Sequence, residues 1–425
     1  MKKMHRTLLS KIISIRKAMT LPLAFTSVLP GLAHAAACPE FRKPQDVLDC
    51  VLKNHPGINL SLAEVEAAKK LRPIADLKLN PEFSNKTLTG LSQGSQLYAE
   101  FNLTQTIERG AKREARAKDA DAQVSVQAAQ SQLAKEAAYR EAAISLYRLR
   151  QINGELRVID DVIGTYKKIR KSLQKRPALT PDQKSSVRLF EISESAYELR
   201  KLPLRIEFDQ ISREIGYGLQ QEFKPNDSVL PKRFSTWPSL QEAPEMQGVA
   251  DAAMQSKKAT IESAQAQIAV AQSEQSYDYR IGPSAEIMRQ YDRNIPSFGF
   301  NVSIPIPFYH NNEAKTVYAN ESLKVAQMAY DVAMAESKKQ RSFFVQKYLR
   351  HLDTIKSLPS YRSLSSKHDE IESFFLEGFI GSGPVLDIHQ QLYEYAKTQD
   401  EIELSMIDAL LRVKAFDGKQ FEVNK

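Results

Sequence analysis

The stretch FNLTQTIERGAKREAR, residues 101–116, joins a short strand pattern directly to a helical one. Apolar and polar residues alternate over its first seven positions, which is the period of a strand with two unlike faces. From Gly110 the sequence becomes charged and alanine-rich, which favours a helix. A second stretch, FNVSIPIPFYHNNEAK, repeats both patterns at residues 300–315, about half a chain later. The repetition indicates a tandem duplication.

The first 37 residues have the pattern of an export signal peptide. Six basic residues precede an apolar run broken by prolines, and small residues end it before Cys38. Removing this segment would lower the formal net charge from +8 to +2, because it contains six basic and no acidic residues. The charge therefore gives no support to a nucleic-acid partner. No other segment has about 18 consecutive apolar residues, so we expect no membrane-spanning helix in the mature chain.

Cys38 and Cys50 are the only cysteines. In an exported chain, two cysteines twelve positions apart are typical of one disulfide that closes a short loop. Two alternatives remain at this point: Cys38 is a lipid-attachment cysteine, although the leucine expected three positions before it is missing, or both thiols are free. A zinc site is not expected, because no Cys-x-x-Cys pair is present.

The rest of the chain divides into two similar repeats, which predicts a mainly helical fold with a small β part. The first repeat, 38–220, contains a β-hairpin at about 81–107 and a long helical hairpin at 110–218. A proline-rich connector follows at 221–244. The second repeat, 245–418, contains a helix, a β-hairpin at about 282–307 and a long helical hairpin at 312–416, before a tail at 419–425.

The second strand of each hairpin has one apolar face. The residues that we expect to face lipid are Leu97, Phe101, Leu103, Phe298, Phe300, Val302 and Ile304. A half-buried hairpin of a soluble protein is the alternative. Each strand has about 10 residues, however, which suits a tilted strand that crosses a bilayer. Four strands cannot close a barrel, so several chains must contribute to one; the alternation does not say whether two, three or four.

Four segments carry a family resemblance: LNPEFSN, FNLTQTIERGAKREARAKDADAQ, FGFNVSIPIPFYHNNEAK and FFLEGFIGSGPVLDIHQQLYEYAKTQDEIE. In their order and duplicated spacing the chain resembles the outer-membrane efflux protein family, the TolC-like outer-membrane factors, and looks closest to members that serve heavy-metal and related cation efflux pumps. The resemblance implies a homotrimer with one shared 12-stranded barrel in outer-membrane lipid and a coiled-coil tunnel in the periplasm. It also implies two partners, a periplasmic adaptor (membrane fusion) protein and an inner-membrane pump of the RND type.

The resemblance places adaptor docking at the tips of the two helical hairpins. The tip residues are Pro177, Pro181, Gly378, Gly381, Gly383 and Pro384. Glycine and proline also supply turn geometry, so a purely structural role is the alternative. In the family, acidic side chains after the second tip narrow the periplasmic aperture. Asp387 matches the first such position, whereas Gln390 stands where a second acid is common, which weakens the case for an acidic ring there; Asp387 could also simply complement the helix dipole.

These patterns favour a passive exit duct in the outer membrane and periplasm, with transmembrane transporter activity and no chemistry of its own. A nucleophile elbow, a glycine-rich phosphate loop and a His-Glu-x-x-His motif are all missing from the sequence, so we expect neither an enzyme nor a cofactor. The alternatives are a non-pore periplasmic coiled-coil scaffold or adaptor, or a type I secretion exit duct. The sequence does not name the solute, which could be metal cations or drugs.

Overall fold

The computed structural model describes residue 38 and residues 40–90, 97–234, 236–240, 251–290, 293–359 and 361–419. The chain separates into two units, Met1–Ala37 and Cys38–Lys425. The proposed export signal at 1–37 and most of the tail at 419–425 lie outside the described residues.

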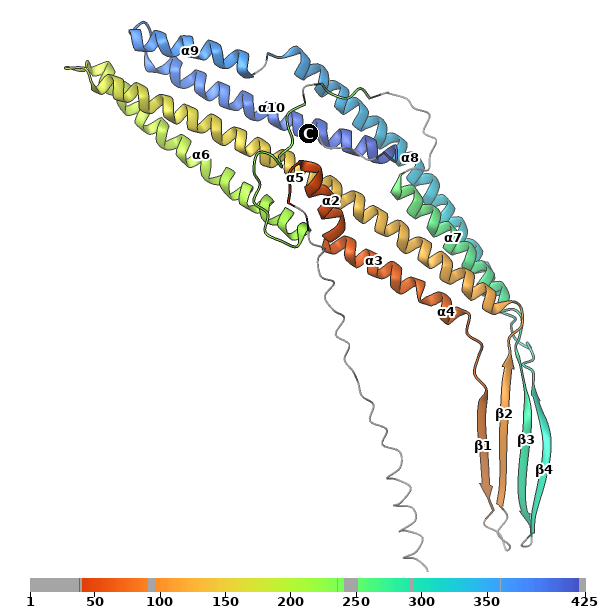
Figure 1. Cartoon of the computed structure of the whole chain (residues 1–425). Helices are drawn as coiled ribbons and strands as arrows, with labels where there is room; N and C mark the ends of the chain where they lie inside the picture. Colours follow the sequence, from red (N-terminus) through yellow and green to blue (C-terminus); the bar gives the residue numbers. More distant parts are fainter. Residues whose placement is uncertain are drawn as a thin grey trace, which may run out of the picture. The chain divides into compact units, whose positions relative to one another are not determined.

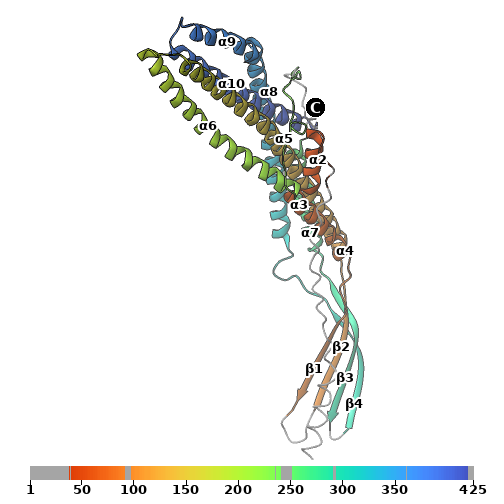
Figure 2. The ribbon, with the colours of Figure 1, turned by 60° about the vertical axis from the view of Figure 1, so that its left-hand side comes forward.

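Long helices and one four-stranded sheet make up the described part of the chain (Figure 1). The elements of the first repeat are α2 (Pro44–Asn54), α3 (Pro56–Lys69), α4 (Leu71–Ala75), β1 (Glu82–Thr89), β2 (Leu97–Ile107), α5 (Lys112–Gln174) and α6 (Pro181–Leu219). Those of the second are α7 (Ala252–Ser273), β3 (Tyr279–Gln290), β4 (Arg293–Ser303), α8 (Glu313–Ser357), α9 (Tyr361–Glu377) and α10 (Ser382–Phe416). In both views the strands extend from one end of the helices (Figure 2).

Each repeat turns sharply where its second strand leads into a long helix. Gly110 and Ala111 have φ angles of 70° and 55° before α5, and Asn312 has a φ of 64° before α8. A Cβ at Gly110 would lie 2.5 Å from the Ser276 side chain, so only glycine fits there. The backbone N–H of Arg109 donates to Asp278 at 3.0 Å. The strand-to-helix turn of the first repeat is thus joined to the helix-to-strand link of the second.

Several boundaries differ from the expected ones. Strand β4 is Arg293–Ser303 and ends before the expected end of the second hairpin at about 307, so Ile304 lies beyond the strand. Pro305 and Pro307, which have no N–H to donate to a sheet hydrogen bond, follow this end. Helix α6 ends at Leu219 and contains Pro203 in its interior. The first arm of the second helical hairpin is divided, because α8 ends at Ser357 and α9 begins at Tyr361. Residues 241–250, which include the expected start of the helix before β3, lie outside the described part.

The helices of the described chain pack through three hydrophobic clusters. The first lies at mid-length, where Tyr147 of α5, Tyr348 of α8 and Leu410 of α10 are fully buried. The connector covers it: Phe234 stacks on Tyr147 with ring centroids 6.0 Å apart, and the Tyr348 hydroxyl donates to the Pro238 carbonyl at 2.6 Å. Burying each such side chain stabilises the fold by roughly 1.5–3 kcal/mol. The connector therefore fastens the two repeats together.

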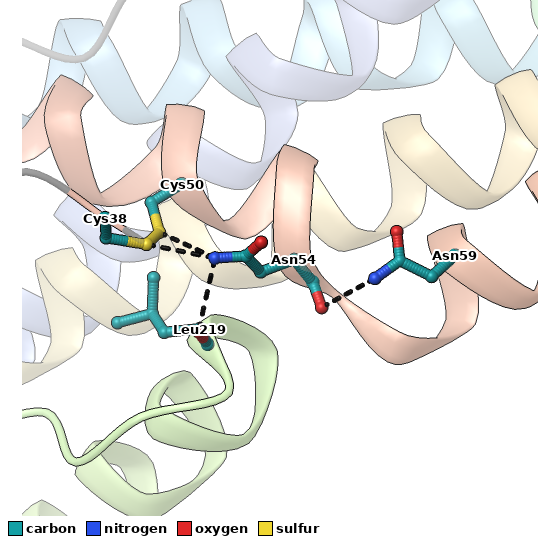
Figure 3. Close-up of a disulfide and its surroundings, with 5 residues drawn as sticks. All are labelled: Cys38, Cys50, Asn54, Asn59 and Leu219. Atoms are coloured by element: carbon teal, nitrogen blue, oxygen red, sulfur yellow. Dashed lines mark hydrogen bonds between the residues drawn. A yellow bond between two sulfur atoms is a disulfide. The ribbon is translucent and has the colours of Figure 1, made fainter. Parts of the chain in front are cut away.

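A disulfide between Cys38 and Cys50 fixes the start of the second unit (Figure 3). The Cα atoms of the two cysteines are 5.9 Å apart. The Asn54 amide nitrogen lies 3.1 Å from the Cys38 sulfur and also donates to the Leu219 carbonyl at 3.5 Å. The segment before α2 is thereby held against the end of α6. A paired Cys38 has no thiol left for lipid attachment.

Candidate functional site

The sheet combines the strands of both repeats. Its order is β1-β2-β3-β4 and every neighbouring pair is antiparallel. The pairing of β2 with β3 joins the two repeats, with Phe101 opposite Ala285. Gly282 allows this pairing, because a Cβ there would lie 1.8 Å from the Leu103 carbonyl oxygen. Residues directly opposite one another share a face, so the register shows which side chains lie together.

One face of the sheet is apolar and uncovered within the described chain. Phe101, Ala285 and Phe298 form one cross-strand row, and Pro283 lies opposite Phe300 in the next. Phe298 is 86% exposed and Phe300 is 65% exposed. Leu97, Leu103 and Val302 are exposed on the same face. Large apolar side chains gathered on an exposed surface indicate contact with lipid or with another chain.

The opposite face is polar except for one row, which consists of Leu88, Tyr98, Met288 and Ile295. Lys86, Glu100 and Glu286 form a row across β1, β2 and β3. The Asn102 amide donates to Glu100 at 2.9 Å. Farther along, Arg280 pairs with Glu82 at 3.0 Å. A sheet with one apolar and one charged face can separate a hydrocarbon phase from water.

At the far end of the helices the two hairpin tips lie side by side. Arg176 of the first tip donates to the Leu376 carbonyl near the second at 3.2 Å. Behind them the rings of Phe190 in α6 and Phe375 in α9 meet edge to face, 5.4 Å apart. The structure thus brings together two turns about 200 residues apart in the sequence.

The proline and glycine residues of the tips have clear roles in the turns. Thr180 caps α6 through the backbone N–H of Gln183, and Pro181 takes the first helical position. Gly378 has a φ of 88°, and Gly381 is the N-cap residue of α10, whose first turn contains Gly383 and Pro384. Pro177 lies in the turn after α5. Turn geometry alone accounts for these residues, whether or not a partner docks there.

Asp387 and Gln390 are both exposed on α10, within three turns of the tip. The Gln391 amide donates to the Asp387 carboxylate at 3.1 Å. Exposed side chains at this position could line an aperture if several copies meet around an axis. Whether they do so remains a prediction.

Between these two residues the sequence reasoning missed His389, which is only 2% exposed. Its Nδ1–H donates to the Val385 carbonyl at 2.6 Å, and its Nε2 lies 3.4 Å from a Glu372 oxygen of α9. Its ring packs edge to face on Tyr166 of α5, 4.9 Å away. The spacing of Val385, His389 and Tyr393 is the one available signal, because it places His389 on the buried face of α10. His389 thus connects three helices beside the exposed Asp387.

A buried charge network at mid-length was also missed. Arg233 of the connector pairs with Asp400 and, at 3.3 Å, with Glu403 of α10. Arg150 of α5 reaches the same Glu403 at 2.5 Å. Burial raises the pKa of Asp400 to about 6, although the nearby arginines oppose that shift. No sequence motif marks this network.

Neither a metal site nor a helical membrane span is found in the described residues. They contain no group of three or more His, Cys, Asp or Glu side chains placed to hold a metal ion. None of the described helices combines the length and apolar character needed to cross a bilayer.

Comparisons with known proteins show the fold. No protein-family model and no curated protein matches the chain. Solved structures do match. The outer-membrane channel OprN has a TM-score of 0.70 at 12% identity, and the match covers 91% of this chain and 95% of OprN. The open state of the Neisseria gonorrhoeae outer-membrane channel MtrE has a TM-score of 0.69 at 12% identity, with 89% of each chain covered. CusC, described as forming a transmembrane channel, has a TM-score of 0.67 at 14% identity, with 92% of this chain and 96% of CusC covered. The chain thus has the fold of solved outer-membrane channels, and the similar scores do not single out one of them.

Proposed function

We propose that the protein is a TolC-like outer-membrane factor, the exit duct of a tripartite efflux system. In this proposal three copies assemble, and their twelve strands close one barrel in the outer membrane while their helices form a tunnel through the periplasm. A periplasmic adaptor docks at the hairpin tips, and an inner-membrane pump of the RND type loads the duct. Metal cations or drugs then leave through the lumen.

The observation that carries the proposal is the sheet, with its exposed apolar face and its charged reverse. Four strands leave two open edges, and unpaired backbone groups cannot be exposed to hydrocarbon. When other copies close the barrel, the apolar face with Phe298 contacts lipid and the charged face with Glu100 contacts water. The shared fold with solved outer-membrane channels supports the same reading.

Solutes would pass through the lumen of the duct without any chemical reaction. Its proposed lining in the barrel consists of charged and polar side chains such as Lys86, Glu100 and Asn102, which solutes can pass without tight binding. Selection of the solute then belongs to the pump. The metal-cation preference rests on the sequence resemblance alone.

Purification and electrical recording test the proposal together. We expect the full chain to require detergent, to have the mass of three copies by native mass spectrometry, and to conduct ions in planar bilayers. A chain that stays monomeric and soluble without detergent and never conducts would instead be a scaffold or adaptor. Deletion of the gene should raise sensitivity to metals or drugs; unchanged sensitivity to both would contradict efflux.

A further inference from the structure

A groove of about 1110 Å³ lies where the strands meet the helices. Helix α4 and the segment after it form one wall, and the end of β2 with the first turns of α5 forms the other (Figure 1). Its lining mixes charged side chains with apolar ones such as Leu79, Ile107 and Ala117.

Every carboxylate that lines the groove has a cationic partner. Arg72 pairs with both Asp76 and Asp121. Lys118 pairs with Glu114 at 2.9 Å. The remaining acid, Glu108, pairs with Arg116 at 2.5 Å. The acids of the groove are therefore already compensated.

Two of the cations that line the groove have no ion-pair partner among the described residues. Lys112 pairs outside the groove, with Asp278 at 2.8 Å. Lys78 and Arg113 are exposed, and neither side chain has an ion pair or hydrogen bond to any residue that the structure describes. The groove therefore retains two positive charges available to an anion.

Apolar side chains accompany these charges. Leu79 of the lining is 46% exposed, and Leu77, which lies just outside the lining on the other side of Lys78 in the sequence, is 64% exposed. The Gln105 amide donates to the Leu79 carbonyl at 2.8 Å, which holds this segment beside β2. Ile107 of the lining lies on the same strand face as Phe101 and Leu103. The groove is thus continuous with the apolar face of the sheet.

We propose that this groove binds an anionic phospholipid of the membrane leaflet nearest the helices. Lys78 and Arg113 hold the phosphate of the head group, while Leu77 and Leu79 contact the upper acyl chains. A phosphate beside exposed apolar groups matches a lipid better than a soluble anion, because a soluble anion would leave the leucines in water. The inference rests on the proposed function, since only a sheet in the bilayer brings head groups to this level.

Native mass spectrometry of the delipidated, detergent-solubilised full chain tests the inference. Phosphatidylglycerol and phosphatidylcholine are added separately, and inorganic phosphate is added in a third arm. We expect phosphatidylglycerol to bind about tenfold more tightly than phosphatidylcholine, and inorganic phosphate not to compete at equal concentration. The double variant Lys78→Gln, Arg113→Gln should lose that preference, because the two cations attract the net negative charge of phosphatidylglycerol, whereas the choline of phosphatidylcholine cancels the charge of its phosphate.

Arg109→Gln is the matched control, because Arg109 is an exposed cation beside the turn that does not line the groove. It should keep the preference for phosphatidylglycerol. Equal binding of the two lipids by the unchanged chain, competition by inorganic phosphate, or an unaltered double variant would each overturn the inference. Loss of the oligomer in the double variant would also overturn it, by assigning the groove to a second copy.

Bilayer conductance separates this inference from the proposed function. A chain that conducts but shows no lipid preference would refute the lipid site alone. A chain that neither conducts nor assembles would refute the duct itself.

Discussion

Phe101 and Phe298 occupy the same row of the sheet, on either side of Ala285, although they come from different repeats. The row forms because β2 and β3 pair with each other at the centre of the sheet. The two repeats therefore build one continuous apolar surface rather than two separate hairpins.

The face assignment predicts opposite results for neighbouring residues of β4. Phe300→Arg or Val302→Arg would place a charge on the proposed lipid face, which costs about 2–4 kcal/mol at mid-bilayer. We expect both variants to lose outer-membrane trimers. Asn301→Arg, on the polar face, should assemble far better. Trimer yield from isolated outer membranes measures the difference, and equal yields for the two classes would refute the assignment.

The close β2–β3 pairing predicts that Gly282→Ala disrupts the sheet, because the new methyl group would collide with the backbone carbonyl of Leu103. We expect little assembled protein. Gly383→Ala is the matched control, since a Cβ there meets nothing within 4 Å. It should assemble normally, as judged by native gels; normal assembly of Gly282→Ala would show that the strands are farther apart.

Asp400 predicts a pH-dependent stability. Burial raises its pKa in the folded chain to about 6. Between its ordinary value of 3.8 and about 6 the folded chain therefore binds more protons than the unfolded one. The contribution of Asp400 is complete below pH 3.8 and is lost as the pH rises through about 6.

Asp400→Asn should remove the loss of folding stability that occurs as the pH rises through about 6. We expect the variant to be more stable than the unchanged chain by about 1–3 kcal/mol at pH 7.5, and the gain to shrink toward pH 4. Thermal unfolding in detergent at several pH values measures it. Asp408→Asn, on the same helix and paired with Arg412, is the control and should show no such trend. A variant equally destabilised at every pH would mean that the pairing with Arg233 outweighs burial.

The disulfide predicts sensitivity to reduction. Cys38 and Cys50 close a loop of twelve residues, so their bond should stabilise the fold by about 3 kcal/mol. We expect the double variant Cys38→Ser, Cys50→Ser to unfold at a lower temperature than the unchanged chain. A reductant should lower the unfolding temperature of the unchanged chain to that of the variant and should leave the variant's unfolding temperature unchanged. Intact mass spectrometry distinguishes the alternatives, because a lipidated Cys38 would add the mass of its acyl chains.

Local patterns in the sequence were enough to predict the elements of the fold. The alternation from Leu97 to Ile107 indicates a strand, and Gly110 marks its end, since period and turn chemistry act over neighbouring residues. The end of β4 was placed too late because apolar alternation continues through Ile304 and Ile306, beyond Ser303, the last residue of β4 that pairs with β3. Alternation of side chains indicates which residues share a face of the strand, but it does not indicate where the backbone hydrogen bonds of the sheet end.

The contacts of the candidate site needed the structure. Arg233 and Asp400 are 167 positions apart, and His389 meets Tyr166 across two helices. Nothing in the residue types alone selects these partners from the many arginines, acids and tyrosines of the chain. Asp387 was predicted as a site residue because the family resemblance marked its position, and that role remains a prediction. The resemblance did not mark the buried His389 two residues later.

The outer strands β1 and β4 each have a neighbour on one side only within the described part of the chain, and they come from different repeats. In the proposed ring, β4 of one copy would pair with β1 of the next, so each copy would contact its two neighbours through different surfaces. A copy with a damaged β4 edge could still accept a neighbour at β1 and then stop the ring from closing. The fraction of rings that fail to close would then exceed the fraction of copies that are defective. In a cell that makes both forms, the defect would therefore be dominant.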